Sequence, residues 1–458
     1  MRRNTLRELE IYIHIPFCVK KCAYCDFLSA PAKEEQRDHY VRMLIEEIRQ
    51  GQPLSVPRGS LLQDEETRRI IAQESAPQNG FLQGNSALEN PQNEEYSVTS
   101  VFIGGGTPSL LSGQQIAAIL EALRAQFHFA DDAELSSDSR LTRTEITMEC
   151  NPGTLDEQRK MKEYRACGVN RISFGLQSAD NAELAELGRI HTWETFLRSY
   201  EAAREAGFSN INVDLMSALP GQTVASWEQT LQKILKLAPE HISAYSLIIE
   251  EGTPFYDKYH EDDERRADGD MPRFLPSEDD ERRMYGLTEQ MLHEAGYEHY
   301  EISNYARPDY ACRHNIGYWR GTEYMGFGLG AASLLRYPFQ NQPVSVRCKN
   351  PVDHAEYAEL VTARSSMEAE RQFERQNECE ILSIEDEMSE FMFLGLRMLS
   401  GVSEQEFFDR FRRPIDAVYG EALKKLISLQ LLKRENGRIF LTPRGLDISN
   451  PVMAEFLL

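Results

Sequence analysis

The stretch Tyr12-Ile13-His14-Ile15-Pro16-Phe17-Cys18, continued by Cys22 and Cys25, decides the fold of this chain. Its apolar run at residues 11–15 predicts a short strand that leads directly into a loop. The three cysteines of that loop have the spacing C-x3-C-x2-C. Iron–sulfur clusters are normally held by four thiolates. Three thiolates on one loop can therefore hold three irons of a [4Fe–4S] cluster and leave the fourth iron open to a small molecule.

A zinc site is the alternative for these cysteines, with a fourth ligand from elsewhere in the chain. Zinc sites built on loops mostly use paired C-x2-C units, which this spacing does not match. Unrelated thiols are the third interpretation. The strand that leads straight into the loop favours the cluster.

Short apolar runs alternate with amphipathic segments through the first two-thirds of the chain. The predicted strands are at residues 11–15, 101–103, 145–149, 171–174, 211–215 and 242–247. The predicted helices between them are at residues 114–127, 182–187, 194–205 and 224–237. This rhythm predicts an α/β fold with a parallel sheet and right-handed crossovers. Six strands indicate a partial (β/α)6 barrel, in which functional residues lie at the carboxyl ends of the strands.

Three stretches interrupt this rhythm. Residues 51–97 are rich in polar residues and predict a surface insertion, and residues 130–143 a shorter one. Residues 261–283 are densely charged and predict a solvated excursion before a helix.

The character of the sequence changes near residue 385. Helices are predicted at residues 388–399, 404–411 and 415–429, followed by a hairpin at residues 431–441 with its turn at Asn436-Gly437. This order predicts a winged-helix-like domain without a strongly basic recognition helix, so a packing or lid role is favoured over DNA binding. We therefore expect residues 1–250 to form the partial barrel, 251–384 an extension of it, and 385–458 the C-terminal domain.

Composition narrows the classes of partner. The chain has 458 residues, of which 41% are hydrophobic, and a net charge of −23. That charge argues against nucleic-acid binding and against a general affinity for anionic membranes. No apolar run is long enough for a transmembrane segment, and the charged first ten residues carry no secretory signal. Eight scattered cysteines do not suggest a disulfide framework, so we expect a cytoplasmic protein.

Several polar or glycine residues fall where the predicted strands end. Gly104-Gly105-Gly106-Thr107-Pro108-Ser109 follows the second strand, and glycine lets a backbone approach a ligand closely. Glu149, Gln177 and Asp214 lie at or near the ends of the third, fourth and fifth strands. Each of them alone is more often a structural polar residue. Together they predict a ligand site at one edge of the sheet.

These motifs resemble the coproporphyrinogen oxidase-like branch of the radical S-adenosylmethionine (SAM) proteins. The resemblance is carried by Y-x-H-I-P-F-C, GGGTPS, NRISFGLQS and DLMSALPGQ, and it covers nearly the whole chain outside the insertions. It implies that Cys18, Cys22 and Cys25 bind a [4Fe–4S] cluster. The residues that it places around SAM are Tyr12, Tyr24, Gly106, Thr107, Glu149, Gln177, Arg189 and Asp214.

Two features place the chain nearer to the heme chaperones of this branch than to its oxygen-independent oxidases. The oxidases carry a further cysteine at the position of Phe27. The segment His314-Asn315-Ile316-Gly317-Tyr318-Trp319 matches H-N-x-x-Y-W, in which the histidine is implied to bind heme. Imidazole is a common heme ligand, and aromatic faces can pack on a porphyrin. A core histidine beside core aromatics is the alternative.

The resemblance implies a heme chaperone that uses a [4Fe–4S] cluster and SAM and delivers heme to apo-hemoproteins, with respiratory enzymes among the candidates. A heme-linked homodimer is consistent with it. The alternative is an oxygen-independent coproporphyrinogen III oxidase, in which a radical derived from SAM starts the oxidative decarboxylation of propionates. A third hypothesis is a radical SAM reaction on an unrelated substrate.

Overall fold

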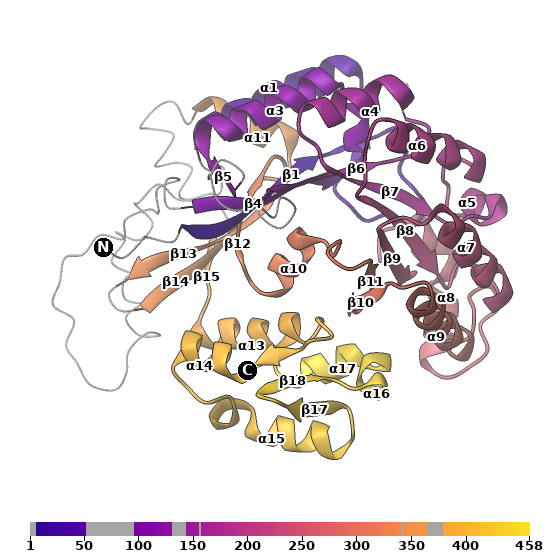
Figure 1. Ribbon diagram of the computed structural model, residues 1–458, viewed down its shortest axis with the longest axis vertical. Coiled ribbons are helices and arrows are strands. Elements are labelled where there is room, and N and C mark those ends of the chain that lie inside the picture. The colour runs from indigo at the N-terminus through magenta and orange to yellow at the C-terminus, as the bar shows by residue number, and fades with distance from the viewer. Residues whose placement is uncertain (1–5, 52–95, 131–142, 155–156, 340–341, 364–378) are drawn as a thin grey trace.

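A curved sheet with helices on its outer face dominates the structure (Figure 1). The computed structural model describes residues 6–51, 96–130, 143–154, 157–339, 342–363 and 379–458. Most of the two predicted insertions at residues 51–97 and 130–143 lies outside the described residues. Among these residues, no helix is long and apolar enough to cross a membrane.

The six predicted strands form one parallel array in chain order. They are β1 (Arg7–Ile15), β4 (Tyr96–Gly105), β6 (Glu145–Cys150), β7 (Arg171–Gln177), β8 (Ile211–Ser217) and β9 (His241–Ser246). The predicted α/β class and parallel sheet are confirmed. The real strands run longer than the apolar runs because they continue into polar residues that face the inside of the curve.

Alternation along β1 shows how the sequence makes two faces. Leu9, Ile11 and Ile13 are fully buried in the main hydrophobic core. The intervening Glu10 and Tyr12 point to the opposite face, because side chains alternate along a strand. The concave face of the sheet therefore carries polar side chains, and the convex face carries the apolar ones.

The convex face is covered by helices that follow the strands (Figure 1). They are α1 (Glu34–Arg49), α3 (Gly113–Gln126), α4 (Glu157–Ala166), α5 (Asn181–Glu186), α6 (Trp193–Glu205), α7 (Val224–Leu237), α8 (Pro254–Ala267) and α9 (Glu278–Glu294). Ser112, Thr192 and Thr223 cap three of these helices by accepting a backbone N–H. The predicted helices at residues 114–127, 194–205 and 224–237 are confirmed to within one residue.

The charged segment at residues 261–283 is more ordered than predicted. The helices α8 and α9 contain most of it. Asp262 of α8 is 4% exposed and accepts the backbone N–H groups of Arg273, Phe274 and Leu275. One carboxylate that the charge pattern assigned to solvent therefore holds the α8–α9 connection.

The described strands continue the sheet on both sides without closing it. Next to β1 lie β12 (Glu323–Phe327), β13 (Ala332–Phe339), β14 (Gln342–Lys349) and β15 (Cys379–Ile381), and next to β9 lie β11 (Asn304–Ala306) and β10 (Glu298–Glu301). Only β12 of these is parallel to its neighbour in the array. The sequence pattern did not predict these strands.

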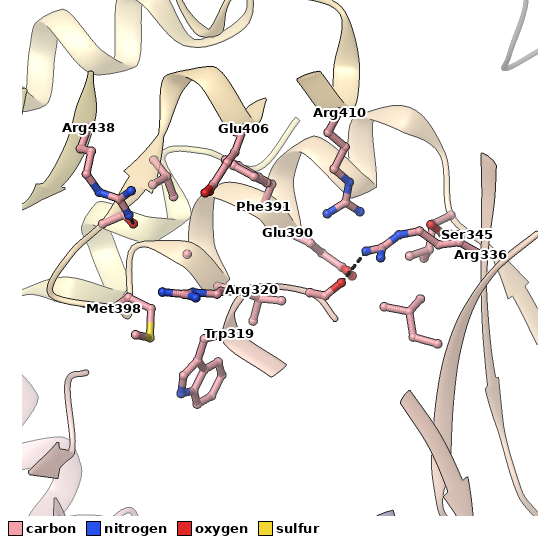
Figure 2. A pocket seen from close by; sticks show the side chains of 17 residues that line it. Trp319, Arg320, Arg336, Ser345, Glu390, Phe391, Met398, Glu406, Arg410 and Arg438 are labelled. Carbon is pink, nitrogen blue, oxygen red and sulfur yellow. Dashed lines mark hydrogen bonds between the residues drawn. The ribbon is translucent and has the colours of Figure 1, made fainter. Parts of the chain in front are cut away.

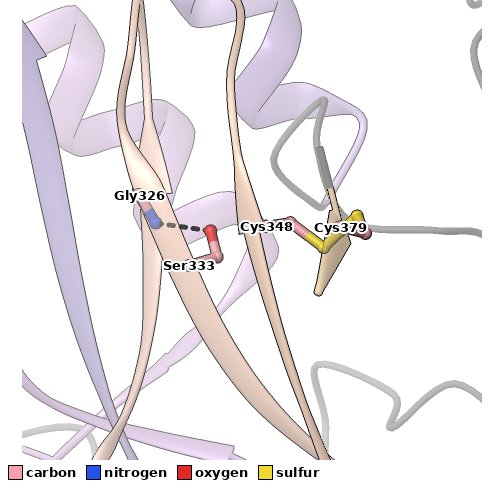
Figure 3. Close-up of a disulfide and its surroundings, with 4 residues drawn as sticks. All are labelled: Gly326, Ser333, Cys348 and Cys379. Atoms are coloured by element: carbon pink, nitrogen blue, oxygen red, sulfur yellow. Dashed lines mark hydrogen bonds between the residues drawn. A yellow bond between two sulfur atoms is a disulfide. The ribbon is translucent and has the colours of Figure 1, made fainter. Parts of the chain in front are cut away.

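A disulfide joins Cys348 of β14 to Cys379 of β15 (Figure 3). The two residues are directly paired in the antiparallel register of these strands. The scattered cysteines of the sequence did not suggest a disulfide. This one becomes recognisable only from the pairing of β14 with β15.

The C-terminal segment has a core of its own. Its helices are α13 (Ile384–Gly395), α14 (Glu404–Phe411), α15 (Ile415–Ser428), α16 (Pro443–Asp447) and α17 (Ser449–Ala454), and its three-stranded sheet contains β16 (Val402–Ser403), β17 (Leu432–Glu435) and β18 (Arg438–Leu441). Asn436 and Gly437 both have positive φ, at 52° and 72°, as a tight hairpin turn requires. The predicted winged-helix-like arrangement is confirmed.

One short helix lies on the concave side of the sheet. This is α10 (Arg313–Trp319), which lies between the array and the C-terminal segment (Figure 1). It contains the whole H-N-x-x-Y-W segment and packs against β4 and α13.

Candidate metal centre and cofactor cavity

A cavity of about 510 Å³ opens at the carboxyl ends of the parallel strands. It brings together the three cysteines of the first loop and residues from five strand ends or the loops after them. The predicted site residues that line it are Cys18, Cys22, Tyr24, Cys25, Gly106, Glu149, Gln177, Arg189 and Asp214. These residues are spread over about 200 positions of the sequence, and only the parallel array makes them neighbours.

The glycine-rich loop after β4 holds the cysteine loop in place. The N–H of Gly106 donates to the carbonyl of Ile15 at 2.9 Å, and the N–H of Thr107 donates to the carbonyl of Phe17 at 2.6 Å. A Cβ on Gly106 would lie 2.6 Å from the Phe17 carbonyl oxygen. Glycine is therefore required here for a close approach between two backbones, in addition to any contact with a ligand.

Two of the three thiols have a hydrogen-bond donor beside them. The Arg189 guanidinium donates to Cys22 Sγ at 3.4 Å, and Thr107 Oγ1 donates to Cys18 Sγ at 3.5 Å. Burial and the neighbouring thiols raise the pKa of the Cys25 thiol. Three thiolates this close need cationic iron to offset their mutual repulsion.

Arg189 links the cysteine loop to the strand ends. Besides its contact with Cys22, its guanidinium donates to Asn151 Oδ1 at 2.7 Å and to the carbonyl of Gly175. Its Nε is buried and has no hydrogen-bond partner among the described residues. A buried cation with an unused donor at the cavity wall is suited to an anionic group such as the carboxylate of an amino acid.

Two buried carboxyl groups face the same cavity. Burial, and then the charge of Asp214, raise the pKa of Glu149 to about 8, although Gly105 N–H donates to Glu149 Oε2 at 3.0 Å. Burial also raises the pKa of Asp214, against hydrogen bonds from Asn212 at 2.7 Å and Ser173 at 3.2 Å. A ligand with a positive charge, or with hydroxyl groups to donate, would stabilise the ionised forms of both.

Gln177 reaches the cavity through an unusual backbone conformation. Its φ is 75°, and the pairing of β7 with β8 shifts register between Gly175 and Gln177. Its Oε1 accepts a hydrogen bond from the Tyr245 hydroxyl at 3.0 Å. Left-handed backbone at a non-glycine residue is uncommon and tends to occur at functional sites.

Two predicted SAM residues do not line this cavity. The Tyr12 hydroxyl is 3.0 Å from His14 Nδ1, and its ring stacks near Phe102. Thr107 is 2% exposed and lines a much smaller neighbouring pocket, where its Oγ1 accepts from Asn151 Nδ2 at 2.7 Å. Both residues therefore support groups around the cavity.

Comparison with known proteins agrees with this geometry. The radical SAM superfamily model matches residues 88–234, and the HemN C-terminal domain model matches residues 382–448. The heme chaperone HemW of Lactococcus lactis is 34% identical, over 98% of this chain and 97% of that protein. HemW of Bacillus subtilis is 31% identical, over 97% of this chain and 98% of that protein. The chain belongs to the HemW family.

The fold of this HemW-family protein also has a solved counterpart. Coproporphyrinogen III oxidase (HemN) from Escherichia coli, a radical SAM enzyme, superposes with a TM-score of 0.68 over 100% of this chain and 91% of that one. The two sequences are only 20% identical, so the likeness concerns the fold. It confirms the partial radical SAM barrel with its C-terminal domain.

Radical SAM proteins hold a [4Fe–4S] cluster and SAM, and the cavity of this HemW-family protein fits both groups. Cys18, Cys22 and Cys25 would hold the cluster, which supplies an electron to SAM when it is reduced. Arg189 would face the carboxylate of SAM. Glu149 and Asp214 would accept hydrogen bonds from its ribose.

His314 lies at the other end of the barrel. Its Nδ1 is 2.9 Å from Ser100 Oγ, and its ring stacks on Phe102 with centroids 5.1 Å apart. The side chain is 14% exposed. Burial, and then the charge of Arg171, lower the pKa of His314 to about 3, so the imidazole is neutral. The two aromatic residues of the same segment differ in exposure. Tyr318 is 43% exposed, whereas the ring of Trp319 lies under the Arg397 guanidinium, 4.3 Å from its centroid.

Sequence reasoning missed some residues of the cavity. Tyr245 and Asn151 line it and contact Gln177 and Arg189 respectively. Tyr245 lies near the end of the sixth predicted strand. The position at a strand end, which identified Glu149, would therefore also have identified Tyr245. Asn151 follows the third strand directly and carries the same signal.

Proposed function

We propose that this protein is a heme chaperone, which binds heme and transfers it to apo-hemoproteins. The observation that carries the proposal is the likeness to two proteins named heme chaperones over almost the full length of both chains. Likeness of that extent includes the barrel, the H-N-x-x-Y-W segment and the C-terminal domain. Heme is the cargo in this proposal, whereas the cluster and SAM are resident groups.

His314 is our candidate for the heme ligand. A neutral imidazole can coordinate heme iron, and the contact of Nδ1 with Ser100 leaves Nε2 as the ligand atom. The ring faces the inside of the barrel in this conformation, so iron reaches it only when α10 moves. Since α10 has seven residues and packs between two larger units, such a movement leaves the sheet intact.

The cluster and SAM would act as regulators of heme binding or transfer. Cys22 contacts Arg189, which also donates to the Gly175 carbonyl of β7, and β7 pairs with β8 in the wall of the barrel. A ligand in the cavity at the carboxyl ends of the strands can therefore change the packing of the barrel around His314. We infer that the apo-hemoproteins served include respiratory enzymes, and that a heme-linked homodimer is the loaded form.

An oxygen-independent coproporphyrinogen III oxidase is the second candidate. The observation in its favour is the complete cavity, in which three thiols and the candidate SAM residues meet as a radical enzyme requires. Against it stands Phe27, which is 65% exposed at the rim of this cavity. The oxidases that the chain resembles carry a further cysteine at that position.

An anaerobic heme titration of the cluster-reconstituted protein tests the first candidate. Wild type, His314→Ala and His293→Ala are compared by visible absorption, with His293 as an exposed histidine on α9 for the control. We expect saturable, near-stoichiometric Soret changes in wild type and in the control, and a loss of at least tenfold in affinity in His314→Ala. Equal binding by all three proteins would remove His314 from the proposal, and no saturable binding by wild type would remove the chaperone function.

A further inference from the structure

A second cavity, of about 340 Å³, lies between the end of α10, the strands β13 and β14, and the C-terminal segment (Figure 2). We call it the interdomain cleft. Trp319, Phe391 and Met398 supply part of its apolar wall. Its size is at the lower end of the ~300–1,000 Å³ typical of small-molecule pockets, so it can take one edge of a large ligand.

Four guanidinium groups surround this cleft. They belong to Arg320, Arg336, Arg410 and Arg438, and Figure 2 shows them on different elements around the same space. The two carboxylates in the lining are Glu390 and Glu406. Glu390 is already engaged, because its Oε1 is 2.6 Å from a guanidinium nitrogen of Arg347, outside the cleft.

The positive charge of the cleft is only partly compensated. A guanidinium nitrogen of Arg410 lies 2.6 Å from a carboxylate oxygen of Glu387. The Arg438 guanidinium donates to the carbonyls of Ser400 and Gly401. Within the described ranges, neither Arg320 nor Arg438 lies within ion-pair distance of a carboxylate. Four cations therefore face a space lined by two carboxylates, one of which is paired with an arginine outside the cleft.

Unused hydrogen-bond donors point to the same conclusion. The Nε of Arg336 and the Nε1 of Trp319 are buried and have no partner among the described residues. Burial, and then the charge of Arg410, lower the pKa of Arg336 to about 10. A buried donor without a partner is costly, and two guanidinium groups that disfavour each other are stabilised by a shared anion.

We propose that the interdomain cleft binds the propionate carboxylates of heme, with the adjoining edge of the macrocycle against Trp319 and Phe391. The identity of the occupant rests on the proposed chaperone function. The chemistry selects it because carboxylates match guanidinium groups in a two-pronged geometry, while the apolar wall is larger than an inorganic anion needs. The cleft adjoins Trp319 of the H-N-x-x-Y-W segment, on the side of α10 that faces the C-terminal segment.

Arg320 offers the cleanest test, because it is exposed and its substitution breaks no described hydrogen bond or ion pair. The variants are Arg320→Glu and Arg320→Lys, with Arg413→Glu as a control for the same charge change at an exposed position of the C-terminal segment. Each protein is titrated with heme and with heme dimethyl ester, in which the carboxylates are blocked. Unchanged thermal unfolding and cluster content establish that the variants are folded.

We expect wild type to bind heme about tenfold more tightly than the ester. Arg320→Glu should lose that preference by weakening heme binding about tenfold, while Arg320→Lys and Arg413→Glu keep it. Equal affinities of wild type for heme and ester, or heme binding by Arg320→Glu at the wild-type level, would overturn the proposal and leave the chaperone function standing. If wild type binds neither compound, the chaperone function itself fails, and the proposed occupant with it.

Discussion

The two ends of the same barrel have opposite characters. At the carboxyl ends of the strands, three thiols, two buried acids and Arg189 surround an open cavity. At the amino ends, α10 covers the polar residues of the same strands. There Glu145 accepts the backbone N–H of Arg313 at 3.1 Å, and Gly317 lies against Glu10. One strand, β6, contributes Glu149 to the first end and Glu145 to the second. The polar residues at the amino ends are thus covered by the chain itself, whereas those at the carboxyl ends face an open cavity.

The largest effect should come from the thiols at the open end. Replacing Cys18, Cys22 or Cys25 by alanine should abolish incorporation of the cluster, because two thiolates cannot hold the cube at this site. Iron and sulfide content and visible absorption after anaerobic reconstitution measure this. Cys167→Ala is the control, since the Cys167 thiol donates to the carbonyl of Tyr164 on α4, away from the cavity. A Cys22→Ala protein with full iron content would contradict the assignment.

The next largest effect concerns the buried acid Glu149 in the protein without cluster or SAM. Its carboxyl has a pKa of about 8 in the folded chain, against 4.5 as the ordinary value. The folded state therefore keeps a proton that the unfolded state releases, and stability falls as the pH rises from about 4.5 to 8, by on the order of a few kcal/mol.

Glu149→Gln should remove this pH dependence and make the protein more stable than wild type at pH 8. Urea unfolding at several pH values measures both effects. Glu201→Gln, at an exposed position of α6, is the control and should follow wild type. If Glu149→Gln follows the wild-type curve, the carboxyl is ionised in the folded chain, and the cavity is more polar than the structure indicates.

A smaller effect is expected at the covered end. A Cβ on Gly317 would lie 2.0 Å from Oε1 of the buried Glu10, so Gly317→Ala should displace α10 and destabilise the protein by about 1–3 kcal/mol. Gly286→Ala is the matched control, because no atom lies within 4 Å of a Cβ there. That control should stabilise helix α9 by ~0.5–1 kcal/mol. Thermal unfolding compares the two, and equal stability would mean that α10 does not press against β1.

The sequence predicted the repeating part of the fold and much of the site at the open end. The six parallel strands follow from local apolar runs and the helices between them, and Glu149, Gln177 and Asp214 follow from their position at strand ends. The strands β12 to β15 and the Cys348–Cys379 disulfide could not be predicted in this way, because they depend on pairing between segments with no regular spacing.

The covered end and the interdomain cleft were beyond local patterns for a related reason. A motif can suggest heme for His314, but only packing shows that its ring faces Phe102 inside the barrel. The arginines of the cleft are separated by up to about 120 positions and resemble ordinary surface charges in the sequence. Their shared cavity exists because the C-terminal segment packs across α10 and the edge strands.

The most direct test of the central claim is an anaerobic transfer experiment with the cluster-reconstituted protein. The protein is loaded with heme, freed of excess heme and mixed with an apo-hemoprotein, and both species are followed by their Soret bands; a parallel sample receives coproporphyrinogen III, SAM and a reductant. A heme chaperone should pass its heme to the acceptor and leave coproporphyrinogen unchanged. Decarboxylation of coproporphyrinogen with consumption of SAM, together with no transfer of heme, would contradict the account and identify the protein as a radical oxidase.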